Sequence, residues 1–376
     1  MPVAVVSGAL ANKAFNGGEA WVRLSWVLGL RRLGFDVYFV EQVEDGSAGR
    51  AYFESVTREF GLADRAALLD AEEGEGGWGL DRAELIDVAS EAELLVNVSG
   101  HLSDERILGA ARTRVYVDLD PGFTQLWHAD PDVPFELGEH DRYVTVGLNV
   151  GRPYCRLPDC GLEWIATPPP VVLDEWPAVP APAGPPRFTT VATWRSPYGA
   201  PLLAGRPLGL KHHAFRRLIE LPERVEGARF ELALDIHSGD SADRDALEAH
   251  GWTLVEPRRV AGTPAAFRDY LAGSTAEFSV AQGVYTETRS GWFSDRTAAY
   301  LASGRPAVLE DTGIGDRLPP SHGLVAFSSL DGAVAAIEAV VREREERAAA
   351  AAAFAARHLD SDLVLGRLLD KLGIGS

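Results

Sequence analysis

The chain has 376 residues, 46% of them apolar, and a formal net charge of −19 at pH 7. Its length allows two domains of roughly 150–200 residues each, and its negative charge argues against a nucleic-acid partner, because nucleic-acid binders carry a basic face. No apolar run reaches the ~18 residues of a membrane-spanning helix, and the N-terminus lacks the basic start of a signal peptide, so we expect a cytoplasmic protein without a membrane span.

The chain opens with the pattern of a strand, a glycine loop, a helix and a second strand. Residues 3–7 form a short apolar run, and the loop after them ends in Asn16-Gly17-Gly18. Apolar residues then recur at helical spacing over 19–33, and residues 36–40 form the next apolar run. This unit predicts a Rossmann-like α/β domain, but its loop lacks the G-x-G-x-x-G pattern of a dinucleotide site.

Polar residues follow three further predicted strands of this domain. The strands are the apolar runs 94–98, 115–118 and 143–148, and the acidic, glycine-rich stretch 71–79 before them predicts a surface loop. Residues just past the carboxyl ends of parallel strands line the ligand crevice of such a sheet. A lone histidine in a loop is also often structural, so both interpretations stay open for the one found here. The residues at these strand ends are His101, Asp118, Asp120 and Asn149.

A proline-rich segment, residues 166–187, separates two halves that both alternate strands with helices. Its prolines prevent regular structure throughout and favour a semi-rigid connection. The sequence therefore predicts one domain at 1–165, a second at 188–345, and closing helices over 346–376.

The second domain opens with a predicted strand, residues 188–194, and two cations follow it. Arg195 comes directly after the strand, and Lys211 precedes a predicted helix. Lys211 is notable because lysine is scarce in this chain. From the residues alone, both cations suit an exposed surface as well as they suit contact with an anion.

The stretch 283–308 combines a loop, two acids and a helix behind a predicted buried strand. Glu287 and Asp295 are eight residues apart, and Ser290-Gly291 lies between them. Such a loop presents free backbone N–H groups and a helix N-terminus, which together favour a phosphate. Two flanking carboxylates suit the hydroxyl groups of a ribose and a sugar. Spacing alone fits a solvated loop with surface acids equally well.

The Glu-x7-Asp spacing, followed by a helix that ends in AxGRPxV, resembles the nucleotide-sugar signature of retaining GT-B glycosyltransferases of the Glu-x7-Glu kind. The stretch SGWFSDRTAAYLASGRP also resembles a bacterial subgroup of these enzymes. The second acid is Asp here, a shorter arm than the Glu of the family. The resemblance implies an α/β protein of two Rossmann-like domains (GT-B) facing each other across a cleft. The first domain would take the acceptor, the second would take the nucleotide sugar, and the last helices would return to the first.

The resemblance also implies roles for individual residues. In that family the first acid contacts the donor sugar and the second contacts the ribose, while a basic pair neutralises the diphosphate. The enzyme would be a hexosyltransferase-like, metal-independent, retaining transferase whose nucleotide sugar is a co-substrate rather than a cofactor. Carried over, Glu287 is a catalytic residue, and the donor-binding residues are Asn16, Gly17, Gly18, Arg195, Lys211 and Asp295. Ser290 and Gly291 join the donor site because of the loop geometry described above. From their positions at strand ends, His101 is the second expected catalytic residue, and Asp120 and Asn149 are expected on the acceptor side of the cleft.

The sequence predicts no metal site. Asp118-Leu119-Asp120 has the spelling of a metal-binding Asp-x-Asp motif, but it falls in the domain expected to take the acceptor. Cys155 and Cys160, the two cysteines, lack a matching Cys/His pair nearby. The sequence leaves open whether these two cysteines pair.

Three other functions fit parts of the pattern. A GT-B-type sugar epimerase or hydrolase would act on the same donors with additional acid–base groups. A non-catalytic nucleotide-sugar-binding protein needs only the binding residues, and a nicotinamide-dependent oxidoreductase shares the Rossmann units but lacks its glycine motif here. The sequence identifies neither the donor sugar, its base, the acceptor, nor the oligomeric state.

Overall fold

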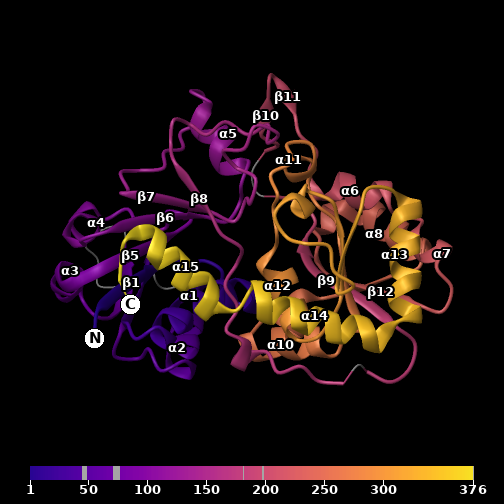
Figure 1. Cartoon of the computed structure of the whole chain (residues 1–376), viewed down its shortest axis with the longest axis horizontal. Coiled ribbons are helices and arrows are strands. Elements are labelled where there is room, and N and C mark those ends of the chain that lie inside the picture. Colours follow the sequence, from indigo (N-terminus) through magenta and orange to yellow (C-terminus); the bar gives the residue numbers. More distant parts are fainter. Residues whose placement is uncertain (45–48, 71–76, 181, 197–198, 376) are drawn as a thin grey trace.

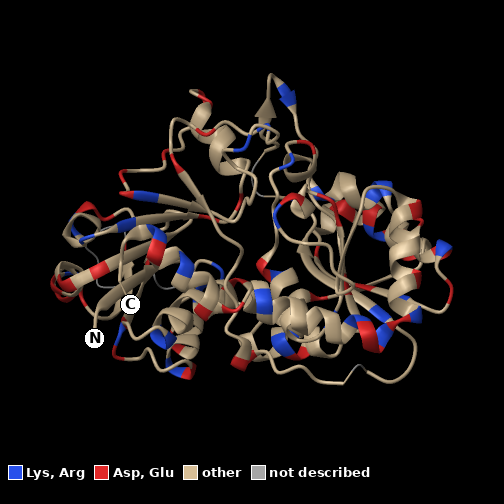
Figure 2. Cartoon of the chain, viewed as in Figure 1, with Lys and Arg blue, Asp and Glu red and all other residues tan. Residues whose placement is uncertain are grey.

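A computed structural model describes residues 1–44, 49–70, 77–180, 182–196 and 199–375. It contains two large sheets, one formed before residue 167 and the other after residue 186 (Figure 1). Residues 71–76 of the expected surface loop lie outside the described residues, and residues 78–79 form a short strand. Acidic and basic residues are interspersed along both halves of the chain (Figure 2).

The N-terminal sheet has eight strands in the order β4-β3-β2-β1-β5-β6-β7-β8. All neighbours are parallel except β3 and β4. Its apolar strands are buried on both faces, as expected of a parallel sheet covered by helices. The strands are β1 (Val3–Ser7), β2 (Asp36–Val43), β3 (Ala66–Asp70), β4 (Trp78–Gly79), β5 (Ala92–Val98), β6 (Arg114–Asp118), β7 (Arg142–Thr145) and β8 (Trp164–Ala166).

Helices connect these strands, and the first begins where the glycine loop ends. The side-chain oxygen of Asn16 accepts a hydrogen bond from the N–H of Glu19 at 3.2 Å, which caps the helix. Gly34, with φ of +89°, follows its end. The helices of this half are α1 (Gly17–Arg32), α2 (Arg50–Glu59), α3 (Arg82–Glu91), α4 (Glu105–Ala110) and α5 (Phe123–Ala129).

The C-terminal sheet has six parallel strands in the order β13-β12-β9-β14-β15-β16. A separate two-stranded hairpin, β10–β11, projects beside α11 (Figure 1). The strands are β9 (Arg187–Thr193), β10 (Leu202–Leu203), β11 (Arg206–Pro207), β12 (Arg229–Asp235), β13 (Trp252–Val255), β14 (Ala276–Ser279), β15 (Ala307–Glu310) and β16 (Leu324–Phe327).

Ten helices follow in the described part of the second half. The long helical region 330–358 is divided in two at Glu343. The helices are α6 (Lys211–Arg217), α7 (Leu221–Arg224), α8 (Ser241–Ala249), α9 (Pro257–Ala261), α10 (Pro264–Ala272), α11 (Gly283–Thr286), α12 (Asp295–Ala302), α13 (Leu330–Arg342), α14 (Arg344–His358) and α15 (Ser361–Leu372).

The two Rossmann-like halves share buried contacts at several points. The last helix, α15, packs against α1, and Gly29 permits the close approach, because a Cβ there would lie 2.5 Å from Leu365 Cδ1. Trp21 of α1 donates its indole N–H to Pro264 O at 2.8 Å. The segment between the sheets carries one short 3₁₀ turn, Leu173–Glu175, and bridges Val171 to Asp360. The domain boundaries given above stay a prediction.

Candidate functional site

The glycine loop after β1 is held by one buried acid. Glu41 of β2 has no exposed surface, and its carboxylate accepts three backbone N–H groups. Leu10 and Ala11 donate to Oε2 at 2.7 and 2.6 Å, and Asn12 donates to Oε1 at 2.8 Å. Burial raises the pKa of Glu41, although the three donors oppose that shift. The sequence analysis missed this residue, and its one signal is an acid inside an apolar strand, FVEQV.

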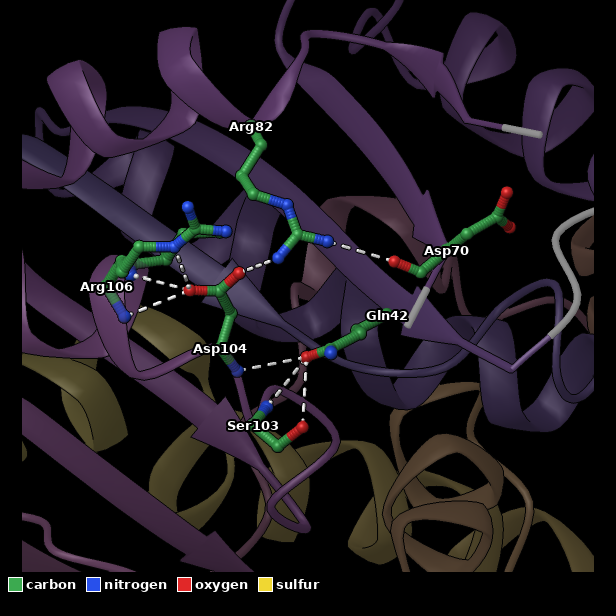
Figure 3. A network of polar contacts seen from close by, with 7 residues as sticks. Gln42, Asp70, Arg82, Ser103, Asp104 and Arg106 are labelled. Atoms are coloured by element: carbon green, nitrogen blue, oxygen red, sulfur yellow. Dashed lines mark hydrogen bonds and ion pairs between the residues drawn. The ribbon is translucent and has the colours of Figure 1, made fainter. Parts of the chain in front are cut away.

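The loop that carries His101 is likewise fixed by side-chain hydrogen bonds. Asn97 donates to Leu102 O at 2.9 Å and accepts from Leu102 N–H at 3.1 Å. On the other side, Gln42 Oε1 accepts from Ser103 N–H at 2.8 Å, and Asp104 pairs with Arg82 (Figure 3). A loop held from both sides keeps the histidine in place.

Six titratable side chains from both domains form what we call the charged cluster: Glu19, Arg23, His101, Asp120, Lys211 and Asp295. Each of them shifts the pKa of at least one other member through its charge or, in the case of Asp295, has its own pKa shifted by the charges of other members. Burial lowers the pKa of Lys211 to about 8, helped by Arg296 and opposed by Asp120 and Glu19. Burial raises the pKa of Asp295 to about 7, with Arg23 opposing this and Glu19 and Asp120 adding to it.

His101 and Asp120 belong to the same cluster. Burial and then Arg23 lower the pKa of His101 to about 4, so its imidazole is neutral at pH 7. Neighbouring protein groups desolvate the Asp120 carboxylate and raise its pKa although the residue keeps solvent contact; a hydrogen bond from the Tyr285 hydroxyl at 3.0 Å to Oδ1 opposes this shift. Glu19 and Arg23 form an ion pair one helical turn apart. The spacing of sequence motifs did not suggest Glu19, Arg23 or Tyr285, because their roles depend on contacts between the domains.

The charged cluster is open to solvent. Of its members, Asp120 is exposed, Glu19, His101, Lys211 and Asp295 are partly exposed, and only Arg23 is buried. Lys211 is the first residue of α6, where the helix dipole disfavours a cation. No described residue forms an ion pair with it. Within the described residues, its charge is therefore balanced only by the more distant carboxylates of Asp120 and Glu19.

A second set of residues forms an interdomain joint: residues 147–149 of the first domain against 289–292 and 312–313 of the second. Asn149 is fully buried, and its side-chain amide donates to Arg289 O and Gly313 O, both at 3.0 Å. Its backbone N–H donates to Ser290 O at 3.0 Å. Asn149 thus links the two domains rather than lining an open surface.

The joint also accounts for Ser290 and Gly291, which were expected to offer free N–H groups to a phosphate. The structure contradicts that expectation: Ser290 N–H donates to Tyr285 O at 3.1 Å, and Gly291 N–H donates to Thr312 O at 2.8 Å. The physical reason is the local backbone, because Arg289 (φ +53°) and Gly291 (φ +68°) turn the chain onto Asn149. The groups left at this end are the first N–H groups of α12, which have no partner inside a helix.

Glu287 and Arg195, which were also expected to contact the donor, lie outside the charged cluster, and each forms a separate ion pair. Glu287, directly after α11, pairs with Arg206 of β11. Arg195 pairs with Asp240 through two nitrogens, at 2.9 Å and 2.6 Å. Neither residue contributes to the pKa shifts of Lys211 or Asp295.

The residues Asn16, Gly17 and Gly18 have structural explanations. A Cβ on Gly17 would lie 2.1 Å from Thr263 O, and one on Gly18 would lie 2.9 Å from the ring of Phe267. Both glycines therefore let the start of α1 approach the second domain, and Asn16 caps the same helix. These three residues thereby position the start of α1, which carries Glu19 of the charged cluster.

The Asp-x-Asp string divides between two environments. Asp118 is buried, and its carboxylate accepts hydrogen bonds from Thr124 (2.6 Å), Thr145 (2.7 Å) and Gln125 (2.8 Å). Burial raises its pKa to about 6 against these donors. In the described part of the chain, no three His, Cys, Asp or Glu side chains gather as metal ligands would, and Cys155 and Cys160 are free thiols.

No helix in the described part of the chain has both the length and the apolar character needed to cross a membrane. No protein-family model matches the chain, and no curated protein sequence matches it.

Solved structures match over nearly the whole chain. Sucrose-phosphate synthase from Thermosynechococcus elongatus matches with a TM-score of 0.58 at 10% identity, over 100% of both chains. HepE of Anabaena, solved with UDP-glucose, matches with a TM-score of 0.58 at 11% identity, over 99% of this chain and 100% of that one. TarM matches with a TM-score of 0.60 at 7% identity, over 98% of each chain. The expected fold is confirmed: the chain has the GT-B fold, with two Rossmann-like domains.

Proposed function

We propose that this protein is a glycosyltransferase that moves a sugar from a nucleoside-diphosphate sugar to an acceptor. The GT-B fold and the Glu-x7-Asp motif support this, and so does the similarity to HepE, which was solved with UDP-glucose. As part of the proposal, the enzyme acts in the cytoplasm of a bacterium, needs no metal and retains the configuration of the sugar. The observation that carries the proposal is Lys211, a partly desolvated cation of the charged cluster that forms no ion pair with any residue the structure describes.

In this proposal the diphosphate lies between Lys211 and the N-terminus of α12. The ammonium group and the first N–H groups of the helix would both face the diphosphate. They would stabilise the negative charge that develops on the leaving nucleotide as its bond to the sugar breaks. Ser290 and Gly291 act here only by placing α12, and Arg195 has no part, because Asp240 already occupies its guanidinium group.

Asp295, the first residue of α12, is the proposed contact of the ribose hydroxyl groups. It is the second acid of the Glu-x7-Asp motif, and in this proposal it lies beside the diphosphate. Glu287 is the proposed contact of the donor sugar, and a sugar there competes with Arg206 for the carboxylate. His101 is neutral at pH 7, so it can give a hydrogen bond to the sugar or acceptor but does not act as an acid there. Asp120 is proposed to contact the acceptor.

The test is incubation of the purified chain with UDP-, GDP-, ADP- and dTDP-sugars, following both the released nucleotide and the fate of the sugar. Transfer to an added acceptor supports the proposal. Sugar released only to water, or an epimerised donor, would indicate a hydrolase or epimerase, and binding without turnover would indicate a non-catalytic protein. Failure to bind any nucleotide sugar would overturn the proposal.

A further inference from the structure

A pocket of about 220 Å³ lies between the two domains, and it shares no lining residue with the charged cluster. Its walls come from the segment after β8, the loop after β15, and the helices α14 and α15 (Figure 1). Leu148 belongs to its wall, whereas the next residue, Asn149, is buried in the interdomain joint. The lining residues are Leu148, Ala166, Thr167, Pro168, Arg317, Leu318, His358, Val364, Arg367, Leu368 and Lys371.

The polar side of this pocket is basic. Arg317, His358, Arg367 and Lys371 line it, and no acidic residue does. The charge of the pocket is opposite in sign to the net charge of the chain, which has 55 acidic residues and 36 Lys and Arg residues. Lys371 is one of only three lysines.

Three of these cations are not used by the fold. Arg317, Arg367 and Lys371 are exposed, and none of them has an ion-pair partner among the described residues. Elsewhere on the surface many arginines are paired, as Arg32 is with Asp362 and Arg216 is with Asp243. Unpaired cations at one pocket raise the local concentration of anions.

The other side of the pocket is apolar. Leu148, Leu318, Val364 and Leu368 line it, and each is less than 9% exposed. The volume is many times the ~10–15 Å³ that a single water molecule needs in a cavity. That size admits a small molecule and excludes a folded partner or a polymer.

We propose that this pocket is a second ligand site, which binds a small molecule carrying a phosphate or a carboxylate on an apolar body. The anionic group would lie among Arg317, Arg367 and Lys371, and the apolar part would lie against Val364 and Leu368. Small-molecule sites combine an apolar lining with a few convergent polar groups in this way. Because both domains and α15 contribute walls, an occupant contacts all three at once.

The test measures binding by calorimetry with hexyl phosphate, hexanoate, hexanol and inorganic phosphate. We expect one molecule of hexyl phosphate or hexanoate per chain, bound at least tenfold more tightly than hexanol or inorganic phosphate, since each of the latter lacks one half of the recognised chemistry. Comparing hexyl phosphate with hexanoate distinguishes a phosphate ligand from a carboxylate ligand. Equal affinity for hexanol, or for inorganic phosphate alone, would overturn the proposal.

Variants then locate the site. Arg367→Gln combined with Lys371→Gln should weaken hexyl phosphate at least tenfold, and both residues are exposed and unpaired, so the fold should tolerate the change. Arg357→Gln is the matched control, because this exposed arginine of α14 lies outside the pocket. Equal weakening by the control would mean non-specific attraction and would overturn the proposal. Displacement of hexyl phosphate by UDP would also overturn the proposal, because it would place the bound hexyl phosphate in the charged cluster. These binding measurements need no sugar transfer, so their outcome is independent of the proposed function.

Discussion

The charged cluster and the interdomain joint both lie where strands of the two domains end, yet they are built in opposite ways. In the joint, the amide of Asn149 and the N–H groups of Ser290 and Gly291 are all hydrogen-bonded within the protein. In the charged cluster, Lys211 and Asp295 are partly exposed, their charged forms are disfavoured by burial, and Lys211 has no ion pair with a described residue.

This difference shows what distinguishes a ligand contact from a structural contact at a strand end. Position alone placed Asn149 and Asp120 in the same class, since both follow strands of one parallel sheet. The two residues differ in how fully their polar groups are hydrogen-bonded within the protein. A polar group with all its hydrogen bonds made stabilises the fold, whereas an accessible group without them costs stability and can bind a ligand. Mutations in the interdomain joint should therefore mainly lower the free energy of unfolding, and mutations in the charged cluster should mainly change ligand affinity.

The largest effect on stability is expected for Gly291→Ala in the joint. Gly291 has φ of +68°, and a Cβ there would lie 3.0 Å from the backbone N of Asn149. Strain and crowding together should lower the free energy of unfolding by about 2–4 kcal/mol, measured by chemical denaturation. Gly315→Ala is the control, since its Cβ would meet nothing within 4 Å, and it should change stability by less than ~0.5 kcal/mol. Similar values for the two variants would contradict the role given to the joint.

The next effect concerns Asp295 and depends on pH. Its pKa in the folded protein is about 7, above the unfolded value of 3.8, so the folded state binds more protons between these values and loses stability as the pH rises through them. Asp295→Asn removes this cost. We expect the variant to be about 1–2 kcal/mol more stable than the wild type at pH 8, a value reduced because the side chain is partly exposed, and to show no gain at pH 4. A constant difference across this range would show that Asp295 is an ordinary surface acid.

The smallest effect on stability is expected for Glu287→Gln, which breaks only a partly exposed pair with Arg206. Its free energy of unfolding should change by less than ~1 kcal/mol. Under the proposed function, affinity for free nucleotide should stay intact, while the transfer rate and the discrimination between sugars should fall. Asp240→Asn, which breaks the surface pair with Arg195, is the control and should leave transfer unchanged. Loss of nucleotide affinity in Glu287→Gln would contradict the assignment to the sugar.

The sequence predicted the fold well, because hydrophobic periodicity and the glycine and proline stops are local signals. The helix expected within 283–308 is α12, which begins at Asp295, and the strand expected at 188–194 is β9. Strand β3, residues Ala66–Asp70, was missed, because AALLD has the composition of a helix and becomes a strand only by pairing with β2.

The candidate site was harder to predict, because its residues meet only through tertiary contacts. Lys211, Asp295, His101 and Asp120 were singled out from the sequence and interact electrostatically within the charged cluster, and their binding roles stay a prediction. Glu19, Arg23 and Glu41 were missed, since each acts through a partner brought close by the fold. Ser290 and Gly291 were expected to face a ligand, and no local pattern distinguishes a free N–H from one that pairs with another loop.

Nucleoside diphosphate affinity in Lys211→Met tests the central claim most directly. Calorimetry with whichever diphosphate the wild type binds should show a loss of roughly tenfold to a hundredfold, because a charge-assisted contact is removed. Wild-type affinity should also fall above about pH 8, where Lys211 loses its proton, and this dependence should vanish in the variant. Arg195→Met, which removes a cation already paired with Asp240, should bind as the wild type does. Unchanged affinity in Lys211→Met, or an equal loss in both variants, would contradict the claim that the charged cluster holds the diphosphate.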